Sequence, residues 1–236
     1  MAGFLRFVVW FSVLLAVLAL VVLPLIATPI LTQMVRDMGL RSETLRVSVD
    51  LFDPSLLVGR ARNLHIVAGN VDMSPAGVGS IDLTLGDVSF FDRTWGSVDG
   101  ELTGISVTTS GGTVTLGSLL IAGPAEEASA TARLSADETE TLIRLAAERE
   151  GLGLDDVQFS NEGVRVTIRD ATSAAQLQVR GGALVLFPGS GSGGVPLIQP
   201  APSDGWAPQE AWISDDGLNV RGVVNTTDLA AQVTRR

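Results

Sequence analysis

Two patterns of apolar residues divide the chain. Residues Phe7 to Leu23 are almost all apolar, and no charged residue occurs between Arg6 and Arg36. Such a stretch is long enough to cross a hydrocarbon core, which needs about 20 residues. From about residue 44 onward, apolar and polar residues alternate instead, which is typical of half-buried β-strands. We therefore expect a transmembrane anchor and connector in residues 1–35 and a β-rich domain in residues 36–236.

A cleaved signal peptide is the alternative for the N-terminal segment. Cleavage after Ala27 would place Leu25 at the −3 position, where a small residue is required. The apolar run is also longer than the roughly 7–15 residues of a signal peptide. Both observations favour a retained anchor.

The charges that flank the anchor leave its orientation open. Arg6 lies on one side, and Arg36, Arg41 and Arg46 lie on the other. A strict positive-inside count would place the C-terminal side in the cytoplasm, but long domains translocate largely regardless of charge. We expect a single-pass protein of the cell membrane with an extracytoplasmic C-terminal domain.

The alternating region predicts about ten antiparallel strands separated by turn residues such as Asn161-Glu162-Gly163 and Asp215-Asp216-Gly217. The apolar members of the strands are Leu45/Val47/Val49/Leu51, Leu64/Ile66, Ile81/Leu83/Leu85, Val98/Leu102, Val114/Leu116, Ala130/Ala132/Leu134, Val164/Val166/Ile168, Leu177/Val179 and Leu218/Val220.

Two of these runs change phase in the middle. In the first, the apolar positions are odd-numbered up to Leu85 and even-numbered from Val88, with Gly86-Asp87 between them. In the second, the change falls at Thr103-Gly104. An extra residue absorbed in one strand keeps the apolar set on one face, so we predict β-bulges at both places. The strands should therefore be long and strongly curved.

One soluble helix interrupts the strands. Ser135 and Glu138 form a capping box at its start, and Gly151 ends it. Glu140 and Arg144 are spaced to form an ion pair on the exposed side of the helix.

The fold class that follows is mainly β, with one N-terminal transmembrane helix and one soluble helix. A single helix cannot cover the apolar faces of ten strands, and each face must be buried against something. We expect a long curved antiparallel sheet that forms a groove, a sandwich or an open barrel. Residues 188–208 are rich in Gly, Ser and Pro and predict a flexible loop.

Composition excludes several kinds of chemistry. The chain has no cysteine, so disulfides and zinc–thiolate sites are ruled out. Its net charge is −10, which disfavours binding to nucleic acid. His65 is the only histidine and alternates with Leu64 and Ile66, so we place it on the polar face of a strand. We expect no catalytic residues, no metal site and no cofactor.

Three tryptophans fall in or beside predicted loops. Trp212 is followed by Ile213, and we expect it to pack in the core. For Trp95 and Trp206, core packing and contact with lipid headgroups stay open.

Five segments occur in a recognisable order: Val49–Leu64, Ile81–Val88, Gly100–Val107, Ala130–Glu138 and the Asp215-Asp216-Gly217 hairpin. Over roughly residues 40–228 this order resembles the LmeA-like proteins, a bacterial family of extracytoplasmic phospholipid-binding proteins. The resemblance implies a location in the cell envelope and phospholipid as the partner. It carries no functional residue across to this chain.

The leading hypothesis is a membrane-anchored envelope protein that binds phospholipid in an apolar groove without catalysis. The headgroup candidates are Arg60 and Arg62. The alternative is a scaffolding β-domain with a closed core and protein partners, and an enzyme is a distant third. The candidates for lining the groove are Leu83, Leu85, Val88, Phe90, Leu142 and Ile143.

Overall fold

The computed structural model describes residues 41–50, 53–73, 76–92, 94–109, 112–189, 193–200 and 206–227. Within these ranges, no helix has both the length and the apolar character needed to cross a membrane. The predicted anchor in residues 1–35 lies outside the described residues.

Strands dominate the described residues, as the alternating pattern predicts. In chain order the elements are β1 (Arg41–Val49), η1 (Pro54–Val58), β2 (Arg60–Met73), β3 (Ala76–Ser89), β4 (Ser97–Thr109), β5 (Gly112–Pro124), β6 (Ala128–Leu134), α2 (Ala136–Arg149), β7 (Asp156–Ser160), β8 (Gly163–Ile168), β9 (Ala171–Arg180), β10 (Ala183–Pro188), β11 (Val195–Ile198), β12 (Trp206–Ser214) and β13 (Gly217–Val224).

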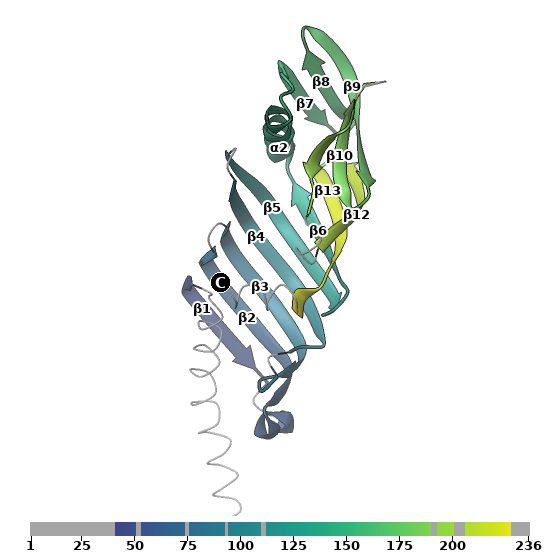
Figure 1. Cartoon of the computed structure of the whole chain (residues 1–236). Coiled ribbons are helices and arrows are strands. Elements are labelled where there is room, and N and C mark those ends of the chain that lie inside the picture. Colours follow the sequence, from purple (N-terminus) through teal and green to yellow (C-terminus); the bar gives the residue numbers. More distant parts are fainter. Residues whose placement is uncertain are drawn as a thin grey trace, which may run out of the picture.

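The strands form two antiparallel sheets (Figure 1). The larger has eight strands in the order β1-β2-β3-β4-β5-β6-β13-β12, and the smaller has five in the order β11-β10-β9-β8-β7. Each strand from β1 to β5 pairs with the next along the chain, so β1–β6 form a simple meander.

The predicted helix is α2, and its capping box is present. The Ser135 backbone N–H donates to Glu138 Oε2 at 2.7 Å, and the Glu138 backbone N–H donates to Ser135 Oγ at 3.3 Å. The predicted Glu140–Arg144 pair is wrong, because each side chain turns to β7 instead. Glu140 accepts from the Phe159 backbone N–H at 2.9 Å, and Arg144 pairs with Asp156 at 3.2 Å.

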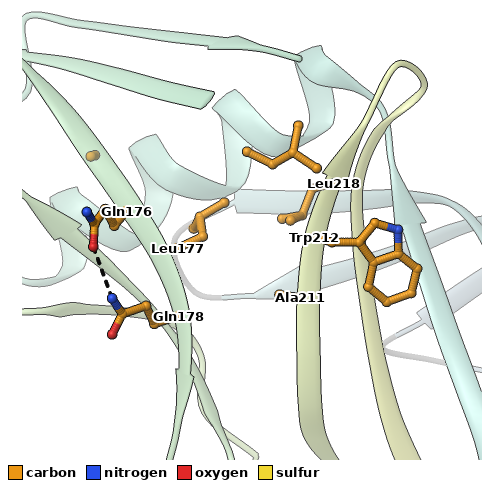
Figure 2. Close-up of a pocket in the computed structure, with 8 residues that line it drawn as sticks. Gln176, Leu177, Gln178, Ala211, Trp212 and Leu218 are labelled. Carbon is orange, nitrogen blue, oxygen red and sulfur yellow. Dashed lines mark hydrogen bonds between the residues drawn. The ribbon is translucent and has the colours of Figure 1, made fainter. Parts of the chain in front are cut away.

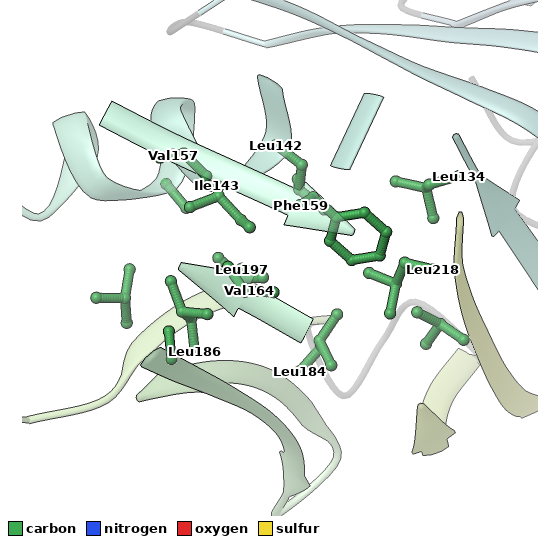
Figure 3. Close-up of a cluster of buried hydrophobic side chains, with 14 of the residues drawn as sticks. Leu134, Leu142, Ile143, Val157, Phe159, Val164, Leu184, Leu186, Leu197 and Leu218 are labelled. Carbon is green, nitrogen blue, oxygen red and sulfur yellow. The ribbon is translucent and has the colours of Figure 1, made fainter. Parts of the chain in front are cut away.

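A closed apolar core lies between α2, the smaller sheet and the β6–β13 part of the larger sheet (Figure 3). Ile143 of α2 is fully buried there, as are Leu184 of β10 and Leu218 of β13. Val195 and Leu197 of β11 also belong to this core. The prediction of a flexible loop over residues 188–208 is therefore wrong for β11, which pairs with β10.

In each of the strands β2–β5, there is a place where the apolar residues switch between odd and even positions. These places lie side by side across the larger sheet. In β3 the apolar positions shift between Val78 and Ile81, and in β4 they shift between Leu102 and Ile105. The pairing register nevertheless continues unbroken past the shift. The same shift occurs in β2 and β5, at Asn70 and Gly117.

Both phase changes therefore occur where the sequence places them, but the predicted mechanism is wrong. A β-bulge adds a residue to one strand of a pair. Here neighbouring strands each carry the extra residue at the same level, which creases the sheet without a slip in register. Gly104 lies on this crease with a φ of 61°, and Asp87 lies at the phase change between Leu85 and Val88 with a φ of 52°.

We predict that Gly104→Ala lowers the free energy of unfolding by about 1–2 kcal/mol, because a left-handed conformation strains any residue that has a Cβ. Space is not the cause, since the nearest atom to an added Cβ is 3.5 Å away. Gly117→Ala is the matched control on the same crease, because Gly117 has no left-handed φ. Chemical denaturation of both variants checks this, and equal losses would contradict it.

Candidate functional site

One face of the larger sheet is apolar from its first strand to the closed core. Paired residues on successive strands place apolar side chains side by side on this face. We call it the apolar face. Its longest row runs from β1 to β13 through Leu45, Ala68, Ile81, Leu102, Leu119, Ala132 and Val220.

The opposite face of the same strands is polar. His65 pairs across the strands with Thr84, and Thr84 pairs with Asp99. Asp82 pairs with Glu101 in the neighbouring row. The larger sheet is therefore amphipathic, with one side suited to water and the other to apolar partners.

Cover on the apolar face is uneven. Among the described elements, α2 packs on β5, β6 and β13, and the smaller sheet contacts β12. The principal packing partners of β1–β4 are one another, β5 and η1. In Figure 1, β1–β4 extend away from the second sheet. The apolar face thus continues well beyond the part that the described helix and second sheet cover.

Four of the six predicted lining residues lie together on this face. Val88 is buried in a cluster around Val47 and Leu64, and Leu85 and Phe90 pack against that cluster. Leu83 contacts the next two clusters along the face. Leu85, Phe90 and Leu83 are only half-buried, so they keep surface available for another molecule.

The other two predicted lining residues lie elsewhere. Leu142 and Ile143 belong to the closed core between the sheets, where Ile143 has no exposed surface. The candidate set therefore splits between the apolar face of the larger sheet, where Leu83, Leu85 and Phe90 are half-buried, and the closed core.

The headgroup candidates Arg60 and Arg62 are exposed at the start of β2. The Arg62 guanidinium lies 3.9 Å from the Asp53 carboxylate, measured from Nε to Oδ1. Among the described residues, Arg60 takes part in no ion pair. Arg60 is therefore the more available cation.

Asp53 fixes the turn that leads into these arginines. Its Oδ1 accepts from the Ser55 backbone N–H at 3.0 Å, and its Oδ2 accepts from the Arg62 backbone N–H at 2.8 Å. Hydrogen bonds from Ser55, through its side chain and its backbone, lower the pKa of Asp53, and the Arg62 N–H and guanidinium act in the same direction. The carboxylate thus ties η1 to the first residues of β2.

His65 lies on the polar face, as predicted. Its Nε2 is 2.8 Å from Asp82 Oδ1, and both side chains are exposed. Among the described residues, no three His, Asp or Glu side chains are grouped so that they could hold a metal ion.

The tryptophans divide between packing and exposure. Trp95 packs against the apolar cluster around Val47 and donates from Nε1 to Thr226 Oγ1 at 2.9 Å. Trp206 packs against the closed core. The prediction that Trp212 packs in the core is wrong: its side chain turns outward beside Arg221, and its neighbour Ile213 takes the inward position.

A cavity of about 310 Å³ lies between β9 and β12, beside Trp212 (Figure 2). Leu177, Ile213 and Leu218 contribute apolar walls, and Gln176 and Gln178 line it from β9. No local pattern in the sequence predicts this cavity, because its walls come from two sheets that are brought together only by the fold.

We predict that Asp53→Asn destabilises the protein at pH 7, because the neutral amide cannot accept the same two hydrogen bonds as well as a carboxylate. The lowered pKa of Asp53 means that the carboxylate stabilises the fold above its usual value of 3.8. This contribution disappears as the pH falls through the lower value of the folded state. Denaturation of both proteins as a function of pH should show the stability gap closing below pH 3.8. A gap that stays constant down to the acid transition would contradict this account.

Comparisons with family models, with curated proteins and with solved structures found no match to this chain. The resemblance to the LmeA-like family stays an expectation that rests on the order of sequence motifs.

Proposed function

We propose that this protein is a membrane-anchored protein of the cell envelope that binds phospholipid, without catalysis, along the apolar face. The observation that supports the proposal is the apolar row that continues from the closed core to β1. Half-buried leucines of this row lie beyond the cover that α2 and the smaller sheet provide. A sheet face of this kind is stabilised by any apolar molecule that shields it from water.

The dimensions of the face suit acyl chains. Adjacent strands are about 4.8 Å apart, so the three spacings from β1 to β4, beyond the cover of α2, span about 14 Å. One leaflet of a bilayer holds about 15 Å of hydrocarbon, which is the depth that one acyl chain fills. Contact with the face removes apolar surface from water at about 25 cal/mol per Å². The lining is mainly aliphatic, with Phe90 and Trp95 at one end, and it offers no fixed polar pattern that would select a rigid ligand.

The phosphate of the lipid would lie near Arg60 at the start of β2. A guanidinium forms strong, charge-assisted hydrogen bonds with phosphate oxygens. Arg62 is a weaker candidate, because the Asp53 carboxylate already balances its charge. Membrane attachment in this proposal comes from the uncharged run in residues 1–35, since a chain with a net charge of −10 is repelled by anionic headgroups.

We predict that Leu85→Asp and Phe90→Asp, made separately in the full chain, give folded proteins that purify with less phospholipid. In a ligand-covered face the new carboxylate reaches water once the lipid has left, so the cost falls on binding. Thermal unfolding and mass spectrometry of bound phospholipid measure the two effects.

Two control variants define the outcomes. Val67→Asp places the same charge on the polar face of β2, between Arg46 and Asp82, and should give a folded protein with bound lipid unchanged. Ile143→Asp places it in the closed core and should prevent folding, because an unpaired buried charge costs several kcal/mol. If Leu85→Asp and Phe90→Asp fail to fold as Ile143→Asp does, the apolar face is ordinary core and the scaffold alternative replaces this proposal.

A further inference from the structure

Two large apolar side chains are exposed to solvent at one end of the larger sheet. Phe91 is 81% exposed and Val58 is 65% exposed. The other exposed large apolar residues of the described chain, Val67 and Trp212, reach only 37% and 38%. We call η1 together with the turn of residues 90–92 the tip.

The tip is a built structure that presents these side chains. The Phe90 backbone N–H donates to the Gly59 carbonyl oxygen at 2.9 Å, which joins the turn after β3 to the end of η1. The Phe91 ring lies against Gly59, where a Cβ would overlap the ring. Gly59 also has a φ of 72°, which favours glycine. The contact with Gly59 therefore holds the Phe91 ring in its exposed position.

The tip continues the apolar face. Along the end of β3, Val88 is buried, Phe90 is half-buried and Phe91 is exposed. Leu56 of η1 packs against the same cluster as Phe90. At this end of the sheet, the apolar face thus ends in apolar side chains that are exposed to solvent.

Charges of both signs surround the tip. Arg60 and Arg62 are exposed beside η1, and Asp50 and Asp92 are exposed on the flanking turns. Asp92 accepts a hydrogen bond from Ser89 Oγ at 2.7 Å. Because the charges are mixed, attraction to a surface would come from the apolar side chains. Exposed apolar groups bordered by polar ones are typical of sites that bind either another protein or a membrane.

The bilayer is within reach of the tip. The uncharged apolar stretch continues past Leu23 to Leu31, and nine residues lie between Leu31 and Arg41. Nine residues can span at most about 30 Å. The strand β1 has nine residues and leads from Arg41 toward the tip, which is also about 30 Å. The chain is therefore long enough to bring the tip to the surface of the membrane that holds the anchor.

We propose that the tip inserts Phe91 and Val58 into the bilayer interface, so that the apolar face opens onto the membrane at this end. The inference rests on the proposed membrane attachment of residues 1–35. Phospholipid then moves between the bilayer and the apolar face past Phe90, without crossing water.

Single-cysteine labelling tests the insertion, because the chain has no other cysteine. Phe91→Cys and Val58→Cys, each made in the full chain, carry an environment-sensitive fluorophore. The proteins are placed in vesicles of phosphatidylcholine and phosphatidylglycerol, with and without lipid that is spin-labelled on its acyl chain. Val67→Cys and Trp212→Cys are matched controls at exposed apolar positions away from the tip. Flotation of the vesicles shows that each protein is attached.

We expect fluorescence at positions 58 and 91 to shift to shorter wavelength and to be quenched by the spin-labelled lipid, with neither effect at positions 67 and 212. Attached protein without quenching at the tip overturns the inference and leaves the proposed attachment standing. Protein that does not float with the vesicles overturns both. Quenching at the tip by a second copy that carries a quencher, but not by labelled lipid, would show that another copy of the chain covers it.

Discussion

The structure depends on one constraint: an apolar sheet face must be covered, and this chain has more such face than its described elements cover. The row of paired residues that begins at Leu45 ends at Val220 inside the closed core. At that end, α2 and the smaller sheet supply the cover, and Ile143 is fully buried. Toward β1 the same face continues with half-buried leucines such as Leu83 and Leu85. The proposed function follows from this imbalance, since a bound lipid would supply the missing cover.

The crease shows how the chain keeps its apolar residues on one side while the sheet bends. A phase change in a single strand would turn half of its apolar residues toward water. Because β2, β3, β4 and β5 change phase at the same level, each row of paired residues across these strands stays either apolar or polar, and the pairing register is the same on both sides of the crease. Gly104 and Asn70 accept left-handed conformations at this line, which are costly for most other residues.

Local patterns in the sequence predicted the local structure well. The capping box of α2 and the turns before β8 and β13 depend on residues a few positions apart, and the structure has them. Contacts between distant segments were not predictable in the same way. Glu140 and Arg144 have helical spacing but bind β7, which the spacing of the helix does not reveal.

The same limit divided the candidate site. Leu85 lies within β3 and Phe90 directly follows that strand, and both pack against the apolar face of the larger sheet. Ile143 has an equally apolar position on its helix, but the smaller sheet closes over it. Which apolar stripe is covered depends on the packing of whole sheets. Neither the strand β11 within a Gly/Pro-rich stretch nor the cavity beside Trp212 has a local signal.

Photo-crosslinking with a phospholipid that carries a photoreactive acyl chain tests the central claim most directly. Because the chain has no lysine, trypsin cleaves only after arginine and releases residues 63–93 and 94–133 as separate peptides, which carry most of the apolar face from β2 to β6. The account predicts acyl-chain crosslinks in these two peptides, at residues of the apolar face. Crosslinks confined to the N-terminal apolar peptide, residues 7–36, would contradict it.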